Sequence, residues 1–315
     1  MIFGIYPGGV AGADDGLAVG RADETEKIRE ALDILQGTAT QFIVRGYEAF
    51  GGRCVPPAVE HYATRGRKLD LVLCCGNDYP GTDEWCEFVR AAVRWYSPSL
   101  GSIQICEEPN LYQYPGDGRY FPHVMDALFR GIIVARDEAV RCGSTVQIGF
   151  NAVPCFNSDD KFWTAFRRDM TAEVLAAVDY VAFDFFPDVF RPVEDVKAAV
   201  TQVLRHFRTV LSHAGIGGHV PVHIGENGWP TSPIRSYERQ AEVINAVVRT
   251  ICELADELNI THYEHFALRD ADSADPDLFR QFGILRDNYE PKPAFETYRA
   301  LVEVFASRDA HATVV

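Results

Sequence analysis

The sequence predicts an α/β protein, a closed (β/α)8 or TIM barrel in a single domain. Short apolar runs alternate with longer amphipathic stretches, and about eight such pairs follow one another at intervals of roughly 30 to 40 residues. The apolar runs are continuous, which is typical of parallel strands that are buried on both faces. No linker rich in Ser, Pro or Gly divides the chain. We therefore expect residues 1–306 to form one barrel and residues 307–315 to form a disordered tail.

Each predicted strand is a short apolar run, and each predicted helix is an amphipathic stretch that follows it. The predicted strands are Ile2–Tyr6, Gln41–Tyr47, Leu69–Cys75, Ser102–Glu107, Thr145–Phe150, Asp179–Phe185, Pro221–Gly225 and Ile260–Ala267. The predicted helices are Asp23–Gln36, Pro57–Arg67, Thr82–Trp95, Phe121–Arg141, Asp159–Ala177, Val193–His213, Tyr237–Leu258 and Pro293–Phe305. A doubly wound open sheet is the alternative, but no Gly-x-Gly-x-x-Gly turn opens a helix after the first strand.

The composition is that of an acidic protein of ordinary hydrophobicity. The chain has 30 Lys and Arg against 45 Asp and Glu, a formal net charge of −15. Such a surface repels phosphate backbones and anionic lipids, so nucleic acids and membranes are poor partners. No apolar run approaches the roughly 20 residues that span a bilayer. The N-terminal Met-Ile-Phe-Gly-Ile-Tyr-Pro has no basic start, so we expect no signal peptide and a cytoplasmic protein.

Neither the cysteines nor the histidines form a pattern typical of a metal site. The eight cysteines include no Cys-x-x-Cys pair, and buried, reduced thiols of a cytoplasmic protein explain them. His262 and His265 are the densest ligand-like group, but strand alternation directs them to opposite faces. The chain also lacks a Gly-x-x-x-x-Gly-Lys phosphate loop and a Gly-x-Ser-x-Gly elbow. We therefore expect no metal and no cofactor.

Two carboxylic acids stand at the ends of predicted strands, where the active sites of such barrels lie. Glu108 follows the fourth strand in the segment Glu-Glu-Pro-Asn, and Glu226 follows the seventh in Gly-Glu-Asn-Gly-Trp-Pro. Hydrolysis of a glycosidic bond uses two carboxyl groups, of which one protonates the leaving oxygen and the other attacks the sugar or activates water. A pair on nearly opposite walls of a barrel therefore indicates glycoside hydrolysis.

These segments resemble the clan A glycoside hydrolases, the retaining β-glycosidases built on the eightfold barrel. In that clan, an acid/base Glu ends strand four in an Asn-Glu-Pro context and a nucleophilic Glu ends strand seven. Glu108 with Pro109 and Asn110 matches the first motif, and the segment around Glu226 matches the second. The segment 282–295 is similar to the closing segment of many members. The resemblance implies that Glu226 is the nucleophile and Glu108 the acid/base, with the family within the clan left unassigned.

Glu107 departs from the pattern of the clan, in which an Asn that binds the 2-hydroxyl of the sugar precedes the acid/base. An ionised carboxylate can accept a hydrogen bond but cannot donate one, so Glu107 indicates an unusual sugar or a cationic group. The alternative is that Glu107 is paired with Arg45, near the end of the second strand. A third hypothesis is that Glu107 raises the pKa of Glu108 by like-charge repulsion, which suits an acid catalyst.

Other polar and aromatic residues near the strand ends are candidates for contacts with a sugar. Trp229 is expected at the mouth, where its indole can stack on a pyranose ring, with simple loop packing as the alternative. Trp85, Trp95 and Trp163 follow helical patterns and are expected in the core. The full set of candidate substrate-binding residues is Glu107, Asn110, Arg45, Trp229, Tyr6, Asn151, Asp184 and Arg269.

The sequence thus predicts a metal-independent glycosidase that cleaves β-glycosidic bonds with retention in a small-molecule glycoside or an oligosaccharide. Two alternatives use the same barrel. One is a carbohydrate-binding or regulatory pseudo-glycosidase, in which Glu107 is a sign of lost catalysis. The other is a transglycosylase, which keeps both glutamates and transfers the sugar to an acceptor other than water.

Overall fold

The computed structural model describes residues 1–13, 16–18, 20–52, 54–157 and 160–306. Within these residues, eight parallel strands form a closed barrel, because β1 pairs with both β11 and β4. The barrel strands are β1 (Ile2–Ile5), β4 (Phe42–Ala49), β6 (Arg67–Cys74), β7 (Leu100–Ile105), β8 (Gln147–Ala152), β9 (Tyr180–Asp184), β10 (Val222–Asn227) and β11 (Ile260–His265). The predicted single-domain (β/α)8 barrel is confirmed. Residues 307–315, predicted as a tail, lie outside the described residues.

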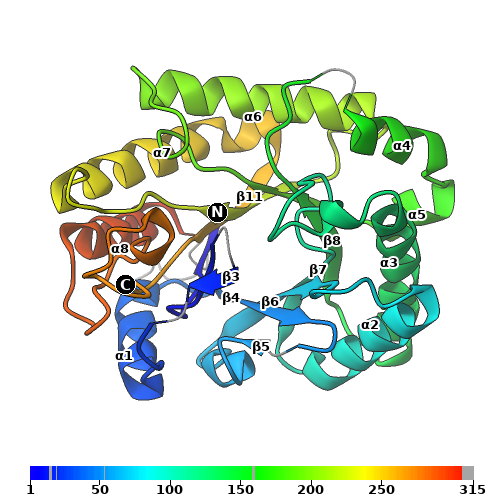
Figure 1. The fold of residues 1–315 in the computed structure, drawn as a ribbon, viewed down its shortest axis with the longest axis horizontal. Helices are drawn as coiled ribbons and strands as arrows, with labels where there is room; N and C mark the ends of the chain where they lie inside the picture. The colour runs from blue at the N-terminus through cyan, green and yellow to red at the C-terminus, as the bar shows by residue number, and fades with distance from the viewer. Residues whose placement is uncertain (14–15, 19, 53, 158–159, 307–315) are drawn as a thin grey trace, which may run out of the picture.

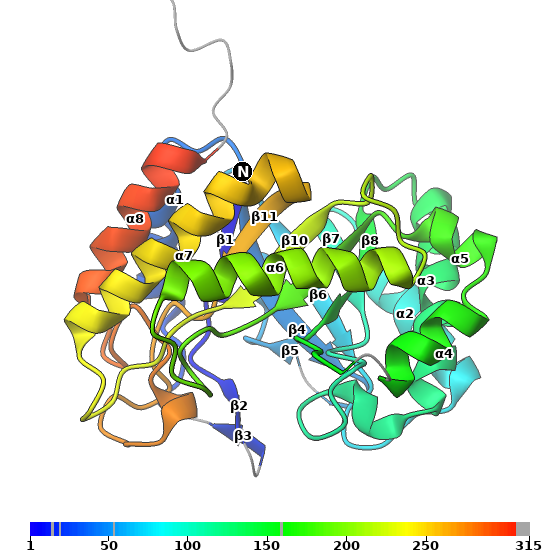
Figure 2. The ribbon, with the colours of Figure 1, turned by 90° about the horizontal axis from the view of Figure 1, so that it is seen from above.

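In the described part of the chain, eight α-helices surround the barrel (Figures 1 and 2). They are α1 (Thr25–Gln36), α2 (Thr82–Tyr96), α3 (His123–Arg141), α4 (Lys161–Asp169), α5 (Ala172–Ala177), α6 (Val196–His213), α7 (Tyr237–Leu258) and α8 (Pro293–Phe305). Each longer helix buries one face; α1, for example, buries Ile28, Leu32 and Leu35, which recur at helical spacing. Three short strands lie outside the barrel order: β2 (Ala11–Ala13), β3 (Gly16–Ala18) and β5 (Cys54–Val55). None of the described helices has the length and apolarity needed to cross a membrane.

The prediction of a helix over residues 57–67 is wrong. Only a 3-10 turn forms there, at Val59–Tyr62. Arg65 and Gly66 both adopt a positive φ, 57° and 83°, so the chain turns instead of continuing a helix and enters β6 at once.

The helix predicted over residues 159–177 is two helices, α4 and α5. Met170 is extended and ends α4. The side chain of Thr171 then accepts a hydrogen bond from the backbone N–H of Val174, which caps the new helix. Asp159, the first residue of the prediction, lies outside the described residues.

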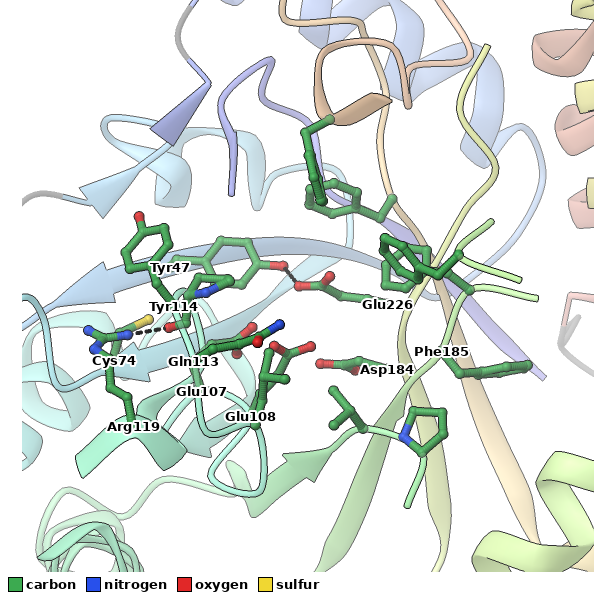
Figure 3. A pocket seen from close by; sticks show the side chains of 18 of the residues that line it. Tyr47, Cys74, Glu107, Glu108, Gln113, Tyr114, Arg119, Asp184, Phe185 and Glu226 are labelled. Atoms are coloured by element: carbon green, nitrogen blue, oxygen red, sulfur yellow. Dashed lines mark hydrogen bonds between the residues drawn. The ribbon is translucent and has the colours of Figure 1, made fainter. Parts of the chain in front are cut away.

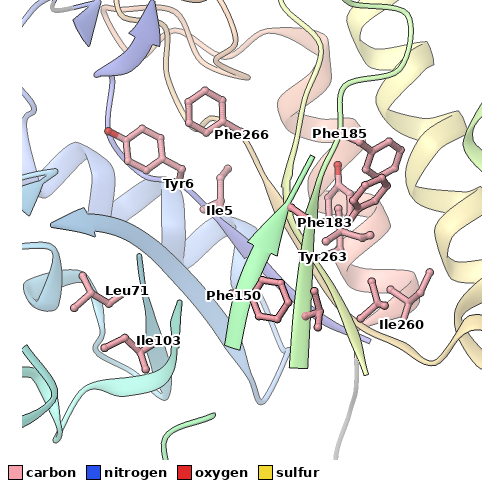
Figure 4. Packing of buried hydrophobic residues seen from close by; sticks show 14 of the residues in the cluster. Ile5, Tyr6, Leu71, Ile103, Phe150, Phe183, Phe185, Ile260, Tyr263 and Phe266 are labelled. Carbon is pink, nitrogen blue, oxygen red and sulfur yellow. The ribbon is translucent and has the colours of Figure 1, made fainter. Parts of the chain in front are cut away.

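Apolar side chains fill the layer between the strands and the surrounding helices (Figure 4). Trp85 is completely buried and Trp163 nearly so, as predicted. Trp95 is 75% exposed, so its predicted place in the core is wrong. The buried face of α2 is formed by Trp85, Val89, Val93 and neighbouring residues, and Trp95 projects to the side of that face.

The two tryptophans of α2 give a matched test of this packing. Trp85→Ala removes a buried indole whose Nε1 donates to the carbonyl of Ala127, so we expect a loss of about 3–5 kcal/mol in the free energy of unfolding. Trp95→Ala should stay within about 0.5 kcal/mol of wild type, as exposed substitutions usually do. Urea unfolding of both variants checks this, and equal losses would contradict the assigned packing of α2.

Candidate active site

The carboxyl ends of the barrel strands surround a cavity of about 1880 Å³. Glu108, which follows β7, and Glu226, in β10, both line it, although each is more than 90% buried. Tyr6, Glu107 and Asp184 line it as well. The barrel therefore brings the two predicted acids and three of their predicted neighbours into one site (Figure 3).

Two side chains of β4 hold Glu226. The hydroxyl of Tyr47 donates a short hydrogen bond to Glu226 Oε1, and Arg45 Nε lies 3.8 Å from the same oxygen. Arg45 Nε also donates to the Tyr47 hydroxyl at 2.7 Å, which orients the tyrosine proton toward the carboxylate. Burial raises the pKa of Glu226, while the Arg45 charge and the Tyr47 hydrogen bond lower it. These two contacts favour the ionised form, the form that can act as a nucleophile.

Glu108 lies in a contrasting environment. Burial raises the pKa of Glu108 well above its usual value, and the negative charges of Glu226 and Asp184 raise it further. Within the described residues, no hydrogen bond or ion pair reaches its carboxyl group. The neutral, proton-donating form is therefore favoured, and a pair of acids whose environments differ in this way divides into a donor and an ionised partner. Glu226 and Asp184 are the largest of the charges that raise this pKa, and the charge of Glu108 raises the pKa of Glu107, so the two adjacent acids repel each other.

The backbone that carries Glu108 is fixed by side chains from neighbouring segments. Cys106 and Glu108 have positive φ angles of 66° and 43°, a conformation that costs a residue other than glycine about 1 kcal/mol or more. Asp117 Oδ2 accepts from the N–H of Glu107 at 2.9 Å, and Asn151 Oδ1 accepts from the N–H of Glu108 at 2.7 Å. These hydrogen bonds offset the strain and set the direction of both carboxyl groups.

Asn151 joins Glu107 to Asp184. Its Nδ2 donates to Glu107 Oε2 at 2.9 Å and also to Asp184 Oδ2. Carboxyl oxygens of Glu107, Glu108 and Asp184 lie within 4.8 Å of one another. Burial raises the pKa of Glu107 well above its usual value, with further contributions from the charges of Glu226 and Glu108. The inner end of the cavity is therefore a compact group of carboxyl groups.

Arg45 lies fully buried beneath this group. Its guanidinium nitrogens lie 2.5 Å from Asp70 Oδ2, 3.7 Å from Asp184 Oδ2 and 3.8 Å from Glu226 Oε1. The predicted pairing of Glu107 with Arg45 is therefore wrong. Arg45 is in the middle of β4 and reaches other strands within the barrel, whereas Glu107 lies beyond the end of β7 and finds Asn151 as its partner.

Trp229 does not provide the predicted stacking surface. Its indole is 3% exposed and is absent from the cavity lining. Nε1 donates to the carbonyl of Asp188 at 3.2 Å, and the guanidinium of Arg235 lies 5.0 Å from the centre of the ring. Trp229 therefore packs within the loops around the barrel, which is the alternative that the sequence left open.

Asn110 and Arg269 also lie away from the cavity lining, so the structure does not bring these predicted residues into the site with the two acids. The amide of Asn110 exchanges two hydrogen bonds of 2.9 Å with the backbone of Val153. The guanidinium of Arg269 donates to Asp23 at 2.9 Å. Both side chains brace the loops that surround the site.

Several residues of the cavity were not singled out from the sequence. Tyr47 is one, although it stands two residues after Arg45 on the same strand and therefore shares its face, which is a usable signal. The outer cavity also has many aromatic rings, which can pack against the apolar faces of a ligand. These rings are Phe50, Tyr79, Tyr114, Phe156, Phe185, Phe186, Phe190, Phe266, Phe279 and Phe282.

Two groups of described side chains have a spacing that could hold a metal ion, where the sequence predicted none. One group consists of Glu107, Glu108 and Asp184, and the other of Cys75, Cys106 and Asp117. In the second group, Asp117 Oδ2 accepts from the backbone N–H groups of Cys75 and Glu107, both at 2.9 Å. Asp117 therefore joins the ends of β6 and β7.

The remaining cysteines and the histidines have structural surroundings. All eight cysteines are free, but only three are buried and Cys142 is exposed, so the prediction of buried thiols is too broad. The ring of His262 is tilted against that of His223, with ring centres 3.7 Å apart, and the ring centre of His265 lies 5.2 Å from that of Tyr298 in α8. The two histidines therefore have different partners, as strand alternation predicts.

The chain was compared with known proteins. No family model matches it. A probable glucan endo-1,3-beta-glucosidase of Aspergillus oryzae is 22% identical over 298 residues, a match that covers 90% of this chain. This chain spans 60% of the length of that relative.

Solved structures share the barrel. A beta-glucosidase from Exiguobacterium marinum has a TM-score of 0.60 at 12% identity, covering 90% of this chain and 87% of that chain. An active-site mutant of the Rhizomucor miehei beta-1,3-glucanosyltransferase, in complex with laminaritriose, has a TM-score of 0.54 at 14% identity, covering 93% and 96%. Other similar structures are glycoside hydrolases of families 2, 17, 39 and 53. The fold is therefore one that glycoside hydrolases use, consistent with the resemblance to clan A, and the family is unassigned.

Asp184 gives a test of the electrostatics of the cavity. Burial raises its pKa to about 8, whereas an unfolded Asp titrates near ~3.9. Between these values the unfolded chain has released a proton that the folded chain still holds, so Asp184 lowers stability as the pH rises. The free energy of unfolding of Asp184→Asn, relative to wild type, should therefore grow from about pH 4 to pH 8 and then level off.

Urea unfolding at pH 5 and at pH 9 measures this difference. Asp78→Asn is the control, because Asp78 is an exposed acid of the same cavity. A difference between Asp184→Asn and wild type that is the same at both pH values would contradict the raised pKa.

Proposed function

We propose that this protein is a glycoside hydrolase that cleaves β-glycosidic bonds with retention of configuration. The observation that carries the proposal is the contrast between two buried acids in one cavity. Glu226 contacts the Arg45 guanidinium and the Tyr47 hydroxyl, and Glu108 has no such partner among the described residues. One ionised and one protonated carboxyl group at a scissile bond are what retaining glycoside hydrolysis uses.

In the first step, the Glu226 carboxylate attacks the anomeric carbon while Glu108 donates its proton to the leaving oxygen. The bond from the anomeric carbon to that oxygen breaks, and an α-linked ester between Glu226 and the sugar forms. The negative charge moves from Glu226 to Glu108. The Tyr47 hydroxyl and the Arg45 guanidinium hold the attacking carboxylate in position before the reaction.

In the second step, Glu108 acts as the base. It takes a proton from water, the water oxygen attacks the anomeric carbon, and the ester bond to Glu226 breaks to release a β product. Among neighbouring charges, Glu226 is the largest contributor to the raised pKa of Glu108. Esterification of Glu226 removes that charge, so the pKa of Glu108 falls when Glu108 has to become a base.

The substrate that fits this cavity best is a β-linked oligosaccharide. The cavity extends well beyond the two acids, and its outer part is lined with aromatic rings. The similarity to a probable glucan endo-1,3-beta-glucosidase and to a glucanosyltransferase in complex with laminaritriose supports this choice. The second similarity also favours a second candidate function, a transglycosylase, in which a sugar bound on the outer rings replaces water in the second step.

The two acids should differ when each is removed. Glu226→Ala removes the group that forms the ester, so turnover should fall by several powers of ten for every β-glycoside. General acid catalysis is typically worth about 10² to 10⁴-fold, so Glu108→Ala should lose that much on substrates with poor leaving groups. It should lose much less on activated aryl glycosides, whose leaving group needs no proton. Rates on a set of chromogenic aryl β-glycosides measure both variants, with Asp78→Asn as the control.

Added azide should restore activity to both variants with opposite stereochemistry. In Glu108→Ala, azide attacks the covalent ester and gives a β-glycosyl azide. In Glu226→Ala, azide enters the vacated space directly and gives an α-glycosyl azide. Proton NMR of the products distinguishes the two. Equal losses of activity on all substrates, with no azide product from either variant, would contradict these roles. A wild-type protein that binds carbohydrate but cleaves no glycoside would favour the pseudo-glycosidase alternative.

A further inference from the structure

The inner end of the cavity contains four carboxyl groups, those of Glu107, Glu108, Asp184 and Glu226 (Figure 3). Among the ion pairs of the described residues, Arg45 reaches only Asp184 and Glu226 of this group, from beneath the cavity. Glu107 and Glu108 have no cationic partner in that part of the chain. The inner end therefore gathers four acidic groups, with little positive charge on the side where a ligand enters.

The basic side chains of the cavity do not neutralise these acidic groups. Arg119 lines the cavity, but its guanidinium donates to the carbonyl oxygens of Gly76, Pro115 and Gly116. Arg191 is exposed and lies on the segment that follows β9. A ligand that reaches the inner carboxyl groups therefore finds hydrogen-bond acceptors and little positive charge.

The side-chain amide at the inner end, which could donate to a sugar hydroxyl, already donates to other protein groups. Asn151 donates its amide protons to Glu107 and Asp184, and its oxygen accepts from the backbone of Glu108. Asp184 Oδ1 is buried and has no hydrogen-bond partner among the described residues, and the carboxyl group of Asp184 points toward Glu108 in Figure 3. The amide of Asn151 therefore has no free donor for a sugar hydroxyl at the inner end.

The position of these acceptors identifies the part of the sugar that they face. In the proposed mechanism, Glu226 and Glu108 act at the anomeric carbon and its leaving oxygen. Oxygens of Glu107 and Asp184 lie within 4.8 Å of Glu108, so in this mechanism they lie beside the anomeric carbon and its leaving oxygen. The two ring neighbours of that carbon are the ring oxygen, which has no proton to donate, and C2.

We propose that the sugar bound at the inner end has a protonated amino group at C2, as in a β-linked 2-amino-2-deoxyglucose, and that Glu107 receives it. This inference rests on the proposed function and names its substrate class. An ammonium group has three donors and a positive charge. That charge lowers the pKa of the acids around it, so the ammonium group and an ionised Glu107 stabilise each other. An Asn at position 107 would instead be neutral and could donate to a hydroxyl.

The same argument excludes the acetylated sugar as the preferred substrate. An acetamido group at C2 has no positive charge, and it has one N–H donor where the ammonium group has three. The free amine, the hydroxyl and the acetamide therefore form a matched series for a test.

The test compares 4-nitrophenyl β-glycosides of glucosamine, glucose and N-acetylglucosamine with the wild-type protein. We expect kcat/KM for the glucosaminide to exceed that for the glucoside by about 10- to 100-fold, which is the typical worth of a hydrogen bond to a charged group. Glu107→Asn should remove or reverse this preference, chiefly through a higher KM for the glucosaminide. Asp256→Asn, which neutralises an exposed acid of α7 outside the cavity lining, should leave the ratio unchanged.

A binding measurement separates this inference from the proposed function. Calorimetric titration of Glu226→Gln, which cannot form the ester, compares a β-linked glucosamine trimer with laminaritriose, and tighter binding of the trimer is expected. A glucoside cleaved as fast as the glucosaminide, or a preference that survives Glu107→Asn, would overturn the inference and leave the glycosidase standing. Preferential binding of the trimer without cleavage of any glycoside would overturn the glycosidase and leave the sugar assignment standing.

Discussion

The polar centre of the barrel depends on one buried cation, the guanidinium of Arg45. It contacts carboxylates from three other strands, those of Asp70, Asp184 and Glu226. Burial raises the pKa of both Asp184 and Glu226, and the Arg45 charge opposes that rise, so part of the group can stay ionised. Removing one partner from a buried ion pair leaves an uncompensated charge and costs about 3–5 kcal/mol. Arg45 therefore positions Glu226, orients the Tyr47 hydroxyl that donates to it, and supplies the positive charge beneath the inner end of the cavity.

The barrel and its pair of acids could be predicted because both follow from local patterns. Continuous apolar runs mark parallel strands, and the ends of parallel strands in a closed barrel meet at one face. Glu108 and Glu226 each follow such a run directly, so the fold alone brings them to one cavity. Tyr47 was within reach of the same reasoning, since it shares a strand face with Arg45. Where function needs two residues at strand ends or on one strand face, sequence is enough.

The path of a loop and the partner of a side chain could not be predicted in this way. Trp229 stands three residues beyond Glu226, and only the course of the loop decides that its indole packs beneath Arg235 and not in the cavity. The partner of Glu107 is Asn151 on the adjacent strand β8, and this pairing depends on the register between β7 and β8. Registers between strands are set by packing of the whole barrel. The local sequence therefore could not show that Asn151, and not Arg45, is the partner of Glu107.

The central claim is that Glu226 forms a covalent ester with the sugar, so that two inversions give net retention. The anomeric configuration of the first product, followed by proton NMR during hydrolysis of an aryl β-glycoside and before mutarotation, tests this most directly. We expect the β anomer to accumulate first and the α anomer to appear later, at the rate of mutarotation. If the α anomer appears first, water attacks in a single displacement, and Glu226 is not the nucleophile.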